Sequence, residues 1–346
     1  MHVIRTRNVH TALPEAVYQM SSRGLPEHSR YGDVLVFPEP VTTVYERPFE
    51  RVLFWQQRDA NPFLHFFTGL WIIAGRNDVA LLSRFAKRME TFSDDGVTLH
   101  GAYGFRWRNH FCLDGDEPLD QIDAVVRELK ANPESRRCVL SMWDPVADLG
   151  RDGKDLPCNT QVYLRIRTVD RTAIPGAVLD ITVTNRSNDI IWGCYGANAV
   201  EFSMLHEYLA RRVGVGVGRY YQVSNNWHAY LNTFEPLRNL QYEASVWSPM
   251  VCPYANRWVA PYEMVQAPER FDENLRTFLA HPEDDVDNDY ANPFFQNVAQ
   301  PLWLAHNAYK DKNFVLARRE LEKCAASDWR TAAVEWLARR QARVAV

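Results

Sequence analysis

The chain has 346 residues, 46% of them hydrophobic, and a formal net charge of -4 at pH 7. This many apolar residues can bury the core of one large domain or of two ordinary ones. The small negative charge and an isoelectric point near 6.2 argue against wholesale binding to a nucleic-acid backbone. The sequence has no apolar run long enough to span a membrane, and its first residues, MHVIRTRNVH, do not resemble a secretion signal. We therefore expect a cytosolic protein with no membrane or nucleic-acid partner.

The first clear element is a buried helix over residues 60–75, an apolar segment with a proline in its first turn. Three strands are predicted next, because residues 137–143, 160–167 and 178–186 alternate and are rich in branched or aromatic side chains. The linker 168–177 contains Pro175-Gly176, a turn signal, so the second and third strands should form an antiparallel hairpin.

A further helix is predicted over residues 198–213, where apolar side chains recur at helical spacing and Gly214 follows as a stop. The glycines of GVGVG (214–218) follow a helix and precede a strand, the reverse of a dinucleotide site, and are read as a turn. Residues 295–343 alternate charged and apolar faces, which is typical of amphipathic helices. We expect a catalytic domain over 1–294 and a helical C-terminal extension over 295–346 that packs on it.

Six cysteines are widely scattered, with no spacing typical of a zinc site. We therefore expect neither a metal site nor disulfide bonds. In a reducing compartment most cysteines are small buried apolar residues, so only neighbouring chemistry can mark one as catalytic. Four segments supply such neighbours: SRRCVLSMWDP (135–145), DLPCNTQ (155–161), NRSNDIIWGCYGAN (185–198) and NNWHAYLN (225–232).

Together these segments resemble the thymidylate synthase family, including its pyrimidine-nucleotide hydroxymethylase relatives, from about residue 28 to residue 235. The resemblance implies an α/β fold of the α+β type, with a mixed, largely antiparallel sheet flanked by helices. It also implies 5,10-methylenetetrahydrofolate as the one-carbon donor and a pyrimidine nucleoside monophosphate as substrate. The family's nucleophile motif matches Pro157-Cys158.

A cysteine suits this chemistry because C5 of a pyrimidine becomes nucleophilic only after a thiolate has added at C6. The resemblance places Arg186 beside that thiolate, which a guanidinium favours. It implies that Arg30, Arg186 and Ser187 bind the phosphate, since paired donors match phosphate oxygens. It further implies that Arg136 and Arg137 reach the same phosphate from the other subunit of a homodimer.

Other site residues follow from the same resemblance. His228 and Tyr230 lie two apart in a strand-like segment, so they share a face and are expected to bind the ribose. Tyr103 resembles the tyrosine that helps to remove the C5 proton, and Asp189 resembles the carboxylate that orients the folate pterin. Asn198 resembles the amide that reads the base; by the family's rule an amide there favours uracil and an aspartate cytosine.

The sequence departs from the family pattern in three places. Thr68 stands where the family has a catalytic glutamate, and a threonine cannot act as a general acid near neutral pH. Asn159 follows the nucleophile where the synthases commonly have histidine. The tryptophan-containing segment before the GxYG motif is replaced by SDDGVTLHGAYG (93–104), so water can reach the one-carbon intermediate and a hydroxymethyl product is expected alongside methyl.

Glu201 lies one helical turn after Asn198, beside an otherwise apolar stripe. We interpret it as a replacement for the missing glutamate, with a preference for dCMP because cytosine must gain a proton at N3. dUMP methylation or hydroxymethylation remains an alternative, as does a catalytically inactive nucleotide-binding regulator. Precursors of modified DNA, made in a host cytoplasm if the chain is phage-encoded, would suit such a departed family member.

Overall fold

The computed structural model describes residues 1–29, 31–113, 117–168, 176–240, 242, 252–283 and 290–344. One mixed sheet forms its centre, in the strand order β1-β4-β8-β7-β6-β5, and the β2–β3 hairpin joins it through pairing of β3 with β8. The strands are β1 His2–Thr6, β2 Leu25–Ser29, β3 Gly32–Val36, β4 Val41–Tyr45, β5 Val139–Ser141, β6 Asn159–Thr168, β7 Ala177–Asp189 and β8 Gly216–Tyr230.

The three strands predicted from the alternating segments are present as β5, β6 and β7. β6 and β7 pair antiparallel, as the turn signal between them predicts. β7 and β8 pair parallel, which requires a crossover, and helix α7 (Asn198–Val213) supplies it. Because β1 and β4 are also parallel and the remaining pairs antiparallel, the expected mixed, largely antiparallel sheet is confirmed.

Helices account for much of the remaining described chain, and both predicted buried helices are found. The helical segments before the crossover are α1 Val9–Arg23, η1 Gln56–Arg58, α2 Pro62–Ile73, α3 Val79–Phe85, η2 Lys87–Phe92, α4 Tyr103–Phe105, η3 Arg106–His110, α5 Gln121–Ala131, α6 Pro145–Asp148 and η4 Ile190–Ala197. Those after β8 are α8 Leu231–Phe234, η5 Glu235–Leu237, α10 Phe271–Ala280, η6 Phe295–Ala299, α11 Gln300–Lys310, α12 Phe314–Glu322 and α13 Ser327–Val344. Within the described ranges, no helix is long and apolar enough to cross a bilayer.

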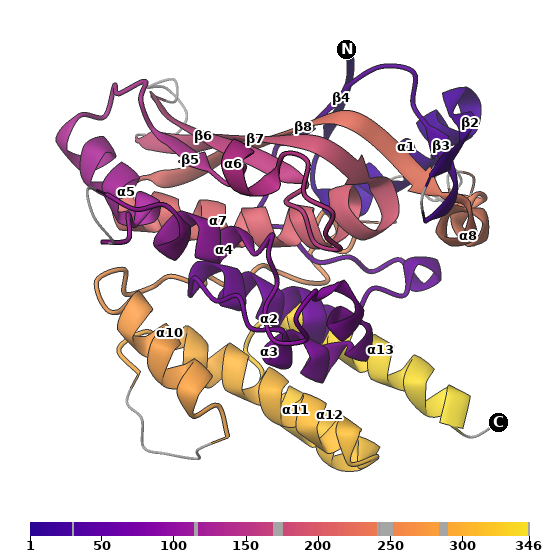
Figure 1. Ribbon diagram of the computed structural model, residues 1–346. Helices are drawn as coiled ribbons and strands as arrows, with labels where there is room; N and C mark the ends of the chain where they lie inside the picture. Colours follow the sequence, from indigo (N-terminus) through magenta and orange to yellow (C-terminus); the bar gives the residue numbers. More distant parts are fainter. Residues whose placement is uncertain are drawn as a thin grey trace.

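The layers follow one another from the sheet downward in Figure 1: the sheet, then α7, then α2, then the C-terminal helices. α7 is buried along almost its whole length. α2 approaches it closely at Gly69, where an added Cβ would lie 2.3 Å from Sδ of Met204. A larger residue at this position would force the Met204 side chain to move, so α2 and α7 are closely packed at Gly69.

The C-terminal helices pack onto this core. Phe63 of α2 lies edge-on against Trp336 of α13, with ring centroids 5.6 Å apart. Asp59 accepts ion pairs from three arginines of α13, Arg339, Arg340 and Arg343, at 2.9 to 3.1 Å. The amphipathic helices predicted over 295–343 are thus present, while the boundary between a domain and an extension at residue 294 stays a prediction.

The glycine-rich segment at 214–218 differs from its prediction as one continuous turn. Gly214 does end α7 in the left-handed conformation, with a φ of 91°. From Gly216 onward, however, the chain already belongs to β8 and pairs with β7. The pairing opportunity along β7 outweighs the turn preference of the glycines, so the turn is only two residues long.

Candidate active site

Cys158 lies just before β6, where a register irregularity near Asn159 interrupts pairing with β7. Its neighbour across the sheet is Arg186 on β7, whose backbone N–H donates to the Cys158 carbonyl at 2.9 Å. The Arg186 side chain donates to the Pro157 carbonyl at 2.9 Å and places Nη2 3.8 Å from Cys158 Sγ. One arginine therefore fixes the cysteine loop and supplies positive charge beside its sulfur.

Opposing influences act on the Cys158 thiol. Burial raises its pKa, the Arg186 charge lowers it, and the charge of Asp155 raises it again; the net pKa lies above the usual value. Asp155 is itself held by the backbone N–H of Gly101 at 2.8 Å. The sulfur is thus a thiol in the free site, and it depends on Arg186 for whatever thiolate it forms.

Two tyrosines lie close enough to Cys158 to feel its charge. Burial, together with the charges of Cys158 and Glu201, raises the pKa of Tyr103 well above its usual value. Burial and the charges of Asp189 and Cys158 likewise raise the pKa of Tyr230. Both phenols are therefore neutral donors beside the sulfur, and the expected neighbourhood of Tyr103 and Tyr230 is present.

His228 and Tyr230 share one face of β8, as their spacing predicts, with ring centroids 5.4 Å apart. β8 lies beside β7 so that Asp189 is opposite His228 and Ser187 opposite Asn226. His228 is buried, and its Nδ1 has no hydrogen-bond partner among the described residues. A ligand hydroxyl would satisfy that nitrogen, which fits the expected contact with a ribose.

Asn198 begins α7 within a chain of buried side-chain amides. Its Nδ2 donates to Asn188 Oδ1 at 3.0 Å, and its oxygen accepts from Asn159 Nδ2 at 3.4 Å. Asn188 in turn donates to Ser224 Oγ at 3.0 Å. The amide of Asn198 therefore has a fixed orientation and retains one N–H and one lone pair with which to read a base edge.

Glu201 is buried, 6% exposed, and forms no hydrogen bond or ion pair with the part of the chain described here. Burial raises the pKa of its carboxyl to about 8, so the group is largely protonated at neutral pH. Thr68, at the position of the family glutamate, is occupied within its own helix: its hydroxyl donates to the Leu64 carbonyl at 2.7 Å. Thr68 therefore supplies no acidic group, and Glu201 adds a carboxyl to those of Asp155 and Asp189 in this part of the molecule.

Asp189, the expected folate-orienting carboxylate, also holds neighbouring backbone segments together. Its carboxylate accepts backbone N–H groups from Ile191 at 3.0 Å, Trp192 at 2.5 Å and Tyr230 at 3.3 Å, tying the end of β7 to η4 and to β8. Burial raises the Asp189 pKa above its usual value. The side chain is held rigidly at the margin of the Cys158 cluster.

Beside Asp189 lies a group of residues that the sequence analysis did not single out. The half-exposed ring of Trp192 has the guanidinium carbons of Arg58 and Arg88 at 4.6 and 3.8 Å from its centroid. Arg58 is 5% exposed, donates Nε to the Ile191 carbonyl, and has an unpartnered Nη2 within the described chain. Nothing in the local sequence marks these residues, because Arg58, Arg88 and Trp192 come from three separate segments.

The phosphate ligands expected from the resemblance are only partly placed by one chain. Arg186 and the half-buried Ser187 stand side by side on β7, and Arg30 lies outside the described residues. Arg136 and Arg137 are exposed on the surface, where Arg137 pairs with Glu128 at 2.9 Å. Exposure is compatible with donation to another subunit, which stays a prediction.

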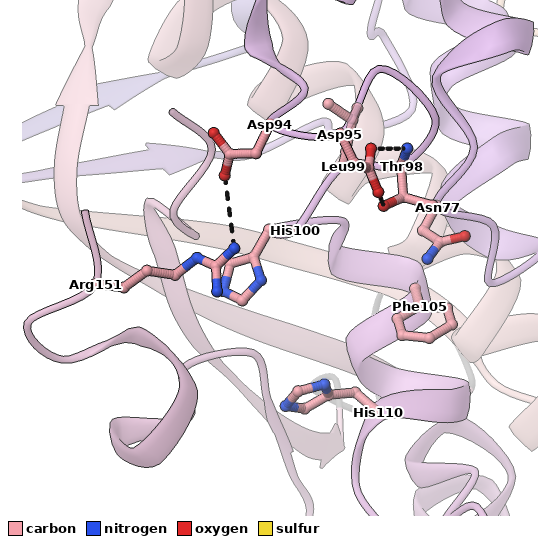
Figure 2. A pocket seen from close by; sticks show the side chains of 9 residues that line it. All are labelled: Asn77, Asp94, Asp95, Thr98, Leu99, His100, Phe105, His110 and Arg151. Carbon is pink, nitrogen blue, oxygen red and sulfur yellow. Dashed lines mark hydrogen bonds and ion pairs between the residues drawn. The ribbon is translucent and has the colours of Figure 1, made fainter. Parts of the chain in front are cut away.

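A polar cavity of about 210 Å³ lies along the segment that replaces the family's tryptophan-containing stretch. Figure 2 shows the residues that line it, with Arg151 paired to Asp94. The expected site residues do not line it. Behind it, buried Arg106 donates to both oxygens of Asp148 at 2.8 and 3.1 Å and so anchors the segment that carries Tyr103.

A model of the thymidylate synthase family matches residues 69–250. The chain is 52% identical to the deoxyuridylate hydroxymethyltransferase of Pseudomonas phage M6 over 99% of this chain and 95% of that protein. It is 38% identical to the Bacillus phage SP01 enzyme of the same name over 56% of this chain and 50% of that protein. A Streptococcus sanguinis thymidylate synthase is 36% identical over 34% of this chain and 40% of its own length.

The chain belongs to the thymidylate synthase family. The resemblance inferred from the four motif segments is thereby confirmed, and so is the expected fold class. The protein is a transferase of the thymidylate-synthase type. Its near full-length similarity to the phage M6 protein includes the C-terminal helices, which lie outside the region that the family model matches.

Proposed function

We propose that the protein transfers a one-carbon unit from methylenetetrahydrofolate to C5 of dUMP and releases 5-hydroxymethyl-dUMP. The observation that carries the proposal is the placement of Arg186 Nη2 3.8 Å from Cys158 Sγ, with Tyr103, Tyr230 and Asn198 gathered around them. Cys158 adds to C6, the electron pair of the C5–C6 double bond moves towards O4, and C5 becomes nucleophilic. Tyr103 then assists in removing the C5 proton.

The choice of uracil rests on Asn198. Asn198 offers one N–H and one lone pair, which match O4 and N3–H of uracil. The names of the two phage relatives agree with this choice. The preference for dCMP inferred from Glu201 alone stays an untested prediction, and the product assay below decides it.

The choice of hydroxymethyl over methyl rests on the segment 93–104. In place of the family's tryptophan-containing stretch, it has no tryptophan that could cover the one-carbon group, and its polar residues Asp94, Asp95, Thr98 and His100 line a separate cavity. Exclusion of water is what would reserve the C5 substituent for reduction to methyl. The phage relatives carry the hydroxymethyltransferase name, which supports the same product.

The folate fits residues of this chain. The exposed indole of Trp192 offers a face for a flat ring, and the unpartnered Nη2 of buried Arg58 offers a donor for a carboxylate, both adjacent to Asp189. We therefore assign Asp189, Trp192, Arg58 and Arg88 to folate binding. When bound, methylenetetrahydrofolate supplies the electrophilic one-carbon unit.

The remaining residues bind the rest of the nucleotide. Arg30, Arg186 and Ser187 hold the phosphate, together with Arg136 and Arg137 of the second subunit of a homodimer. His228 and Tyr230 hold the ribose hydroxyl. We place the reaction in the cytoplasm, that of the host if a phage encodes the chain, where its product would serve as a precursor of modified DNA.

A mass-spectrometric product assay tests the proposal with methylenetetrahydrofolate and each of dUMP, dCMP, UMP and CMP. We expect a hydroxymethyl mass gain on dUMP alone and no product from Cys158→Ala. Conversion of dCMP instead would show that Glu201 was the better guide to the base. A Cys158→Ala enzyme as active as the wild type would refute the covalent route, and absence of any product would favour the inactive-regulator alternative.

A further inference from the structure

Glu201 stands out among the carboxylates near Cys158 because it has no partner. Asp189 accepts three backbone N–H groups, and Asp155 is held by Gly101. Glu201 is 6% exposed and lacks any hydrogen bond or ion pair to the described residues. A buried carboxyl without a partner costs stability and therefore points to a ligand or water that completes it.

A second unpartnered oxygen lies in the same part of the site. Oδ1 of fully buried Asn159 has no partner among the described residues, while its Nδ2 bonds Asn198, one helical turn before Glu201. The Tyr220 hydroxyl accepts from Gln222 Nε2 at 2.7 Å, so its own proton is available to another group. Tyr220 is close enough to Glu201 and Tyr103 for their charges to add to burial in raising its pKa.

We propose that Glu201 is the general base that takes a proton from the water attacking the one-carbon group on C5, and that it thereby determines the hydroxymethyl product. The inference rests on the proposed function and assigns its water step to one residue. If Asn198 binds O4 and N3–H of the base as proposed, the C4–C5 side of the ring lies towards α7, which carries Glu201 one turn further on. A water molecule between the base and this helix turn could donate hydrogen bonds to the Glu201 carboxylate and to Asn159 Oδ1.

The step balances as follows. The water oxygen bonds to the exocyclic methylene carbon on C5, and one water proton passes to Glu201 in its ionised form, which is the minor form at neutral pH and the major one above about pH 8. The methylene electron pair moves through C5 and C4 onto O4. That pair then returns to form the C5–C6 double bond, the C6–S bond breaks, and Cys158 leaves as a thiolate. Glu201 afterwards returns its proton to the thiolate or to solvent.

The reverse of this step gives a test that needs no folate. When 5-hydroxymethyl-dUMP is incubated with the enzyme in H₂¹⁸O, Cys158 adds to C6, the hydroxyl leaves as water, and labelled water adds back. Mass spectrometry then measures a gain of ¹⁸O in the nucleotide. We expect Glu201→Gln to slow this exchange about 100-fold or more, the usual size of a general-base contribution, and Glu201→Asp to restore part of it.

A companion reaction measures Cys158 addition without the water step. Dithiothreitol removes bromine from 5-bromo-dUMP after Cys158 has added to C6, and is itself oxidised to the disulfide while bromide leaves. We expect Glu201→Gln to keep this debromination. As a matched control, Ser203→Ala removes a buried polar group of the same helix whose hydroxyl bonds only the Val200 carbonyl in the described structure, and both reactions should persist.

Wild-type ¹⁸O exchange in Glu201→Gln would overturn the inference and leave the proposed function standing. Loss of exchange and debromination together would also overturn it, since Glu201 would then act at cysteine addition. Failure of the wild-type enzyme to form 5-hydroxymethyl-dUMP from dUMP in the product assay would instead refute the proposed function.

Discussion

Arg186 Nη2 lies 3.8 Å from Cys158 Sγ while the same guanidinium donates to the carbonyls of Leu156 and Pro157. Positive charge and loop geometry therefore depend on one side chain. Burial alone would keep the thiol protonated, because it raises the Cys158 pKa, and the Arg186 charge is the influence that lowers it. The rate at which the thiol reacts therefore reports how strongly the Arg186 charge lowers the Cys158 pKa.

Arg186→Gln should raise the Cys158 pKa further and slow its alkylation by iodoacetamide at pH 7.5 on the order of tenfold, as one pKa unit implies. Arg186→Lys keeps the charge but cannot donate to two carbonyls in the same way, so an intermediate rate is expected. The pH profile of alkylation gives the pKa directly, with Cys158→Ala as the blank. An unchanged profile in Arg186→Gln would show that another group activates the sulfur.

Asn198→Asp should shift substrate preference from dUMP towards dCMP. An aspartate replaces the N–H donor that suits O4 with an acceptor that suits the cytosine amino group. We expect kcat/KM for dUMP to fall about 100-fold, corresponding to the loss of a buried hydrogen bond to substrate. Competition between the two nucleotides, followed by mass spectrometry, measures the ratio. Retained dUMP preference would place base recognition elsewhere, with Glu201 the next candidate.

Local patterns in the sequence were sufficient for the helices and strands around the site. Alternation predicted β6 and β7, helical spacing predicted α7 with its residue bounds, and the two-residue interval of His228 and Tyr230 predicted their shared face. These features depend on short-range periodicity and burial on one side of an element. The glycines after α7 were misjudged because pairing with β7, a long-range contact, decides where β8 begins.

Local sequence patterns could not predict contacts between segments that are far apart in the chain. Arg58, Arg88 and Trp192 meet only through the fold, and Tyr220 of β8 lies near enough to Glu201 of α7 for the glutamate charge to affect its pKa. The lack of a partner for Glu201 is likewise a property of its surroundings. Sequence reasoning noted an unexplained carboxylate in an apolar stripe, but only the fold shows that this carboxyl is buried, which raises its pKa to about 8.

Glu201→Gln should change how stability depends on pH. In the folded protein the Glu201 pKa is raised to about 8, whereas an unfolded glutamate ionises near its ordinary value. Between about pH 5 and 8 the folded state therefore binds more protons, and this residue lowers stability as pH rises. Urea denaturation at pH 5, 6, 7 and 8 should show Glu201→Gln gaining on the wild type by on the order of 1 kcal/mol per pH unit. Parallel curves would mean that Glu201 is ionised in the folded protein.

Arg136→Ala and Cys158→Ala should each abolish activity but restore it when mixed. If Arg136 serves the other subunit's phosphate site, a mixed dimer has one site with both residues intact. Random exchange of equal amounts gives about a quarter of the sites intact, so about a quarter of the wild-type rate per site is expected. Mixing after mild denaturation and refolding measures this directly. If the mixture is no more active than either variant alone, Arg136 serves the active site of its own subunit or takes no part in an active site.

Asp59→Asn tests whether the C-terminal helices depend on the ion-pair cluster with Arg339, Arg340 and Arg343. Asp59 adopts a left-handed conformation with a φ of 47°, which asparagine tolerates equally well, so the substitution changes charge and little else. We expect a stability loss on the order of 1 kcal/mol in low salt, because three arginines lose their shared carboxylate and repel one another.

Salt provides the internal check on that prediction. Raising the ionic strength from 0.05 to 0.5 M should reduce the difference between Asp59→Asn and the wild type, since screening weakens both the attraction and the repulsion. Glu283→Gln is the control, because its ion pair with Arg84 is more exposed, with the glutamate side chain 59% accessible, and little change is expected. Hydrogen exchange in α13 should rise in Asp59→Asn alone. Unaltered exchange there would show that apolar contacts such as Phe63 with Trp336 suffice to hold the helix.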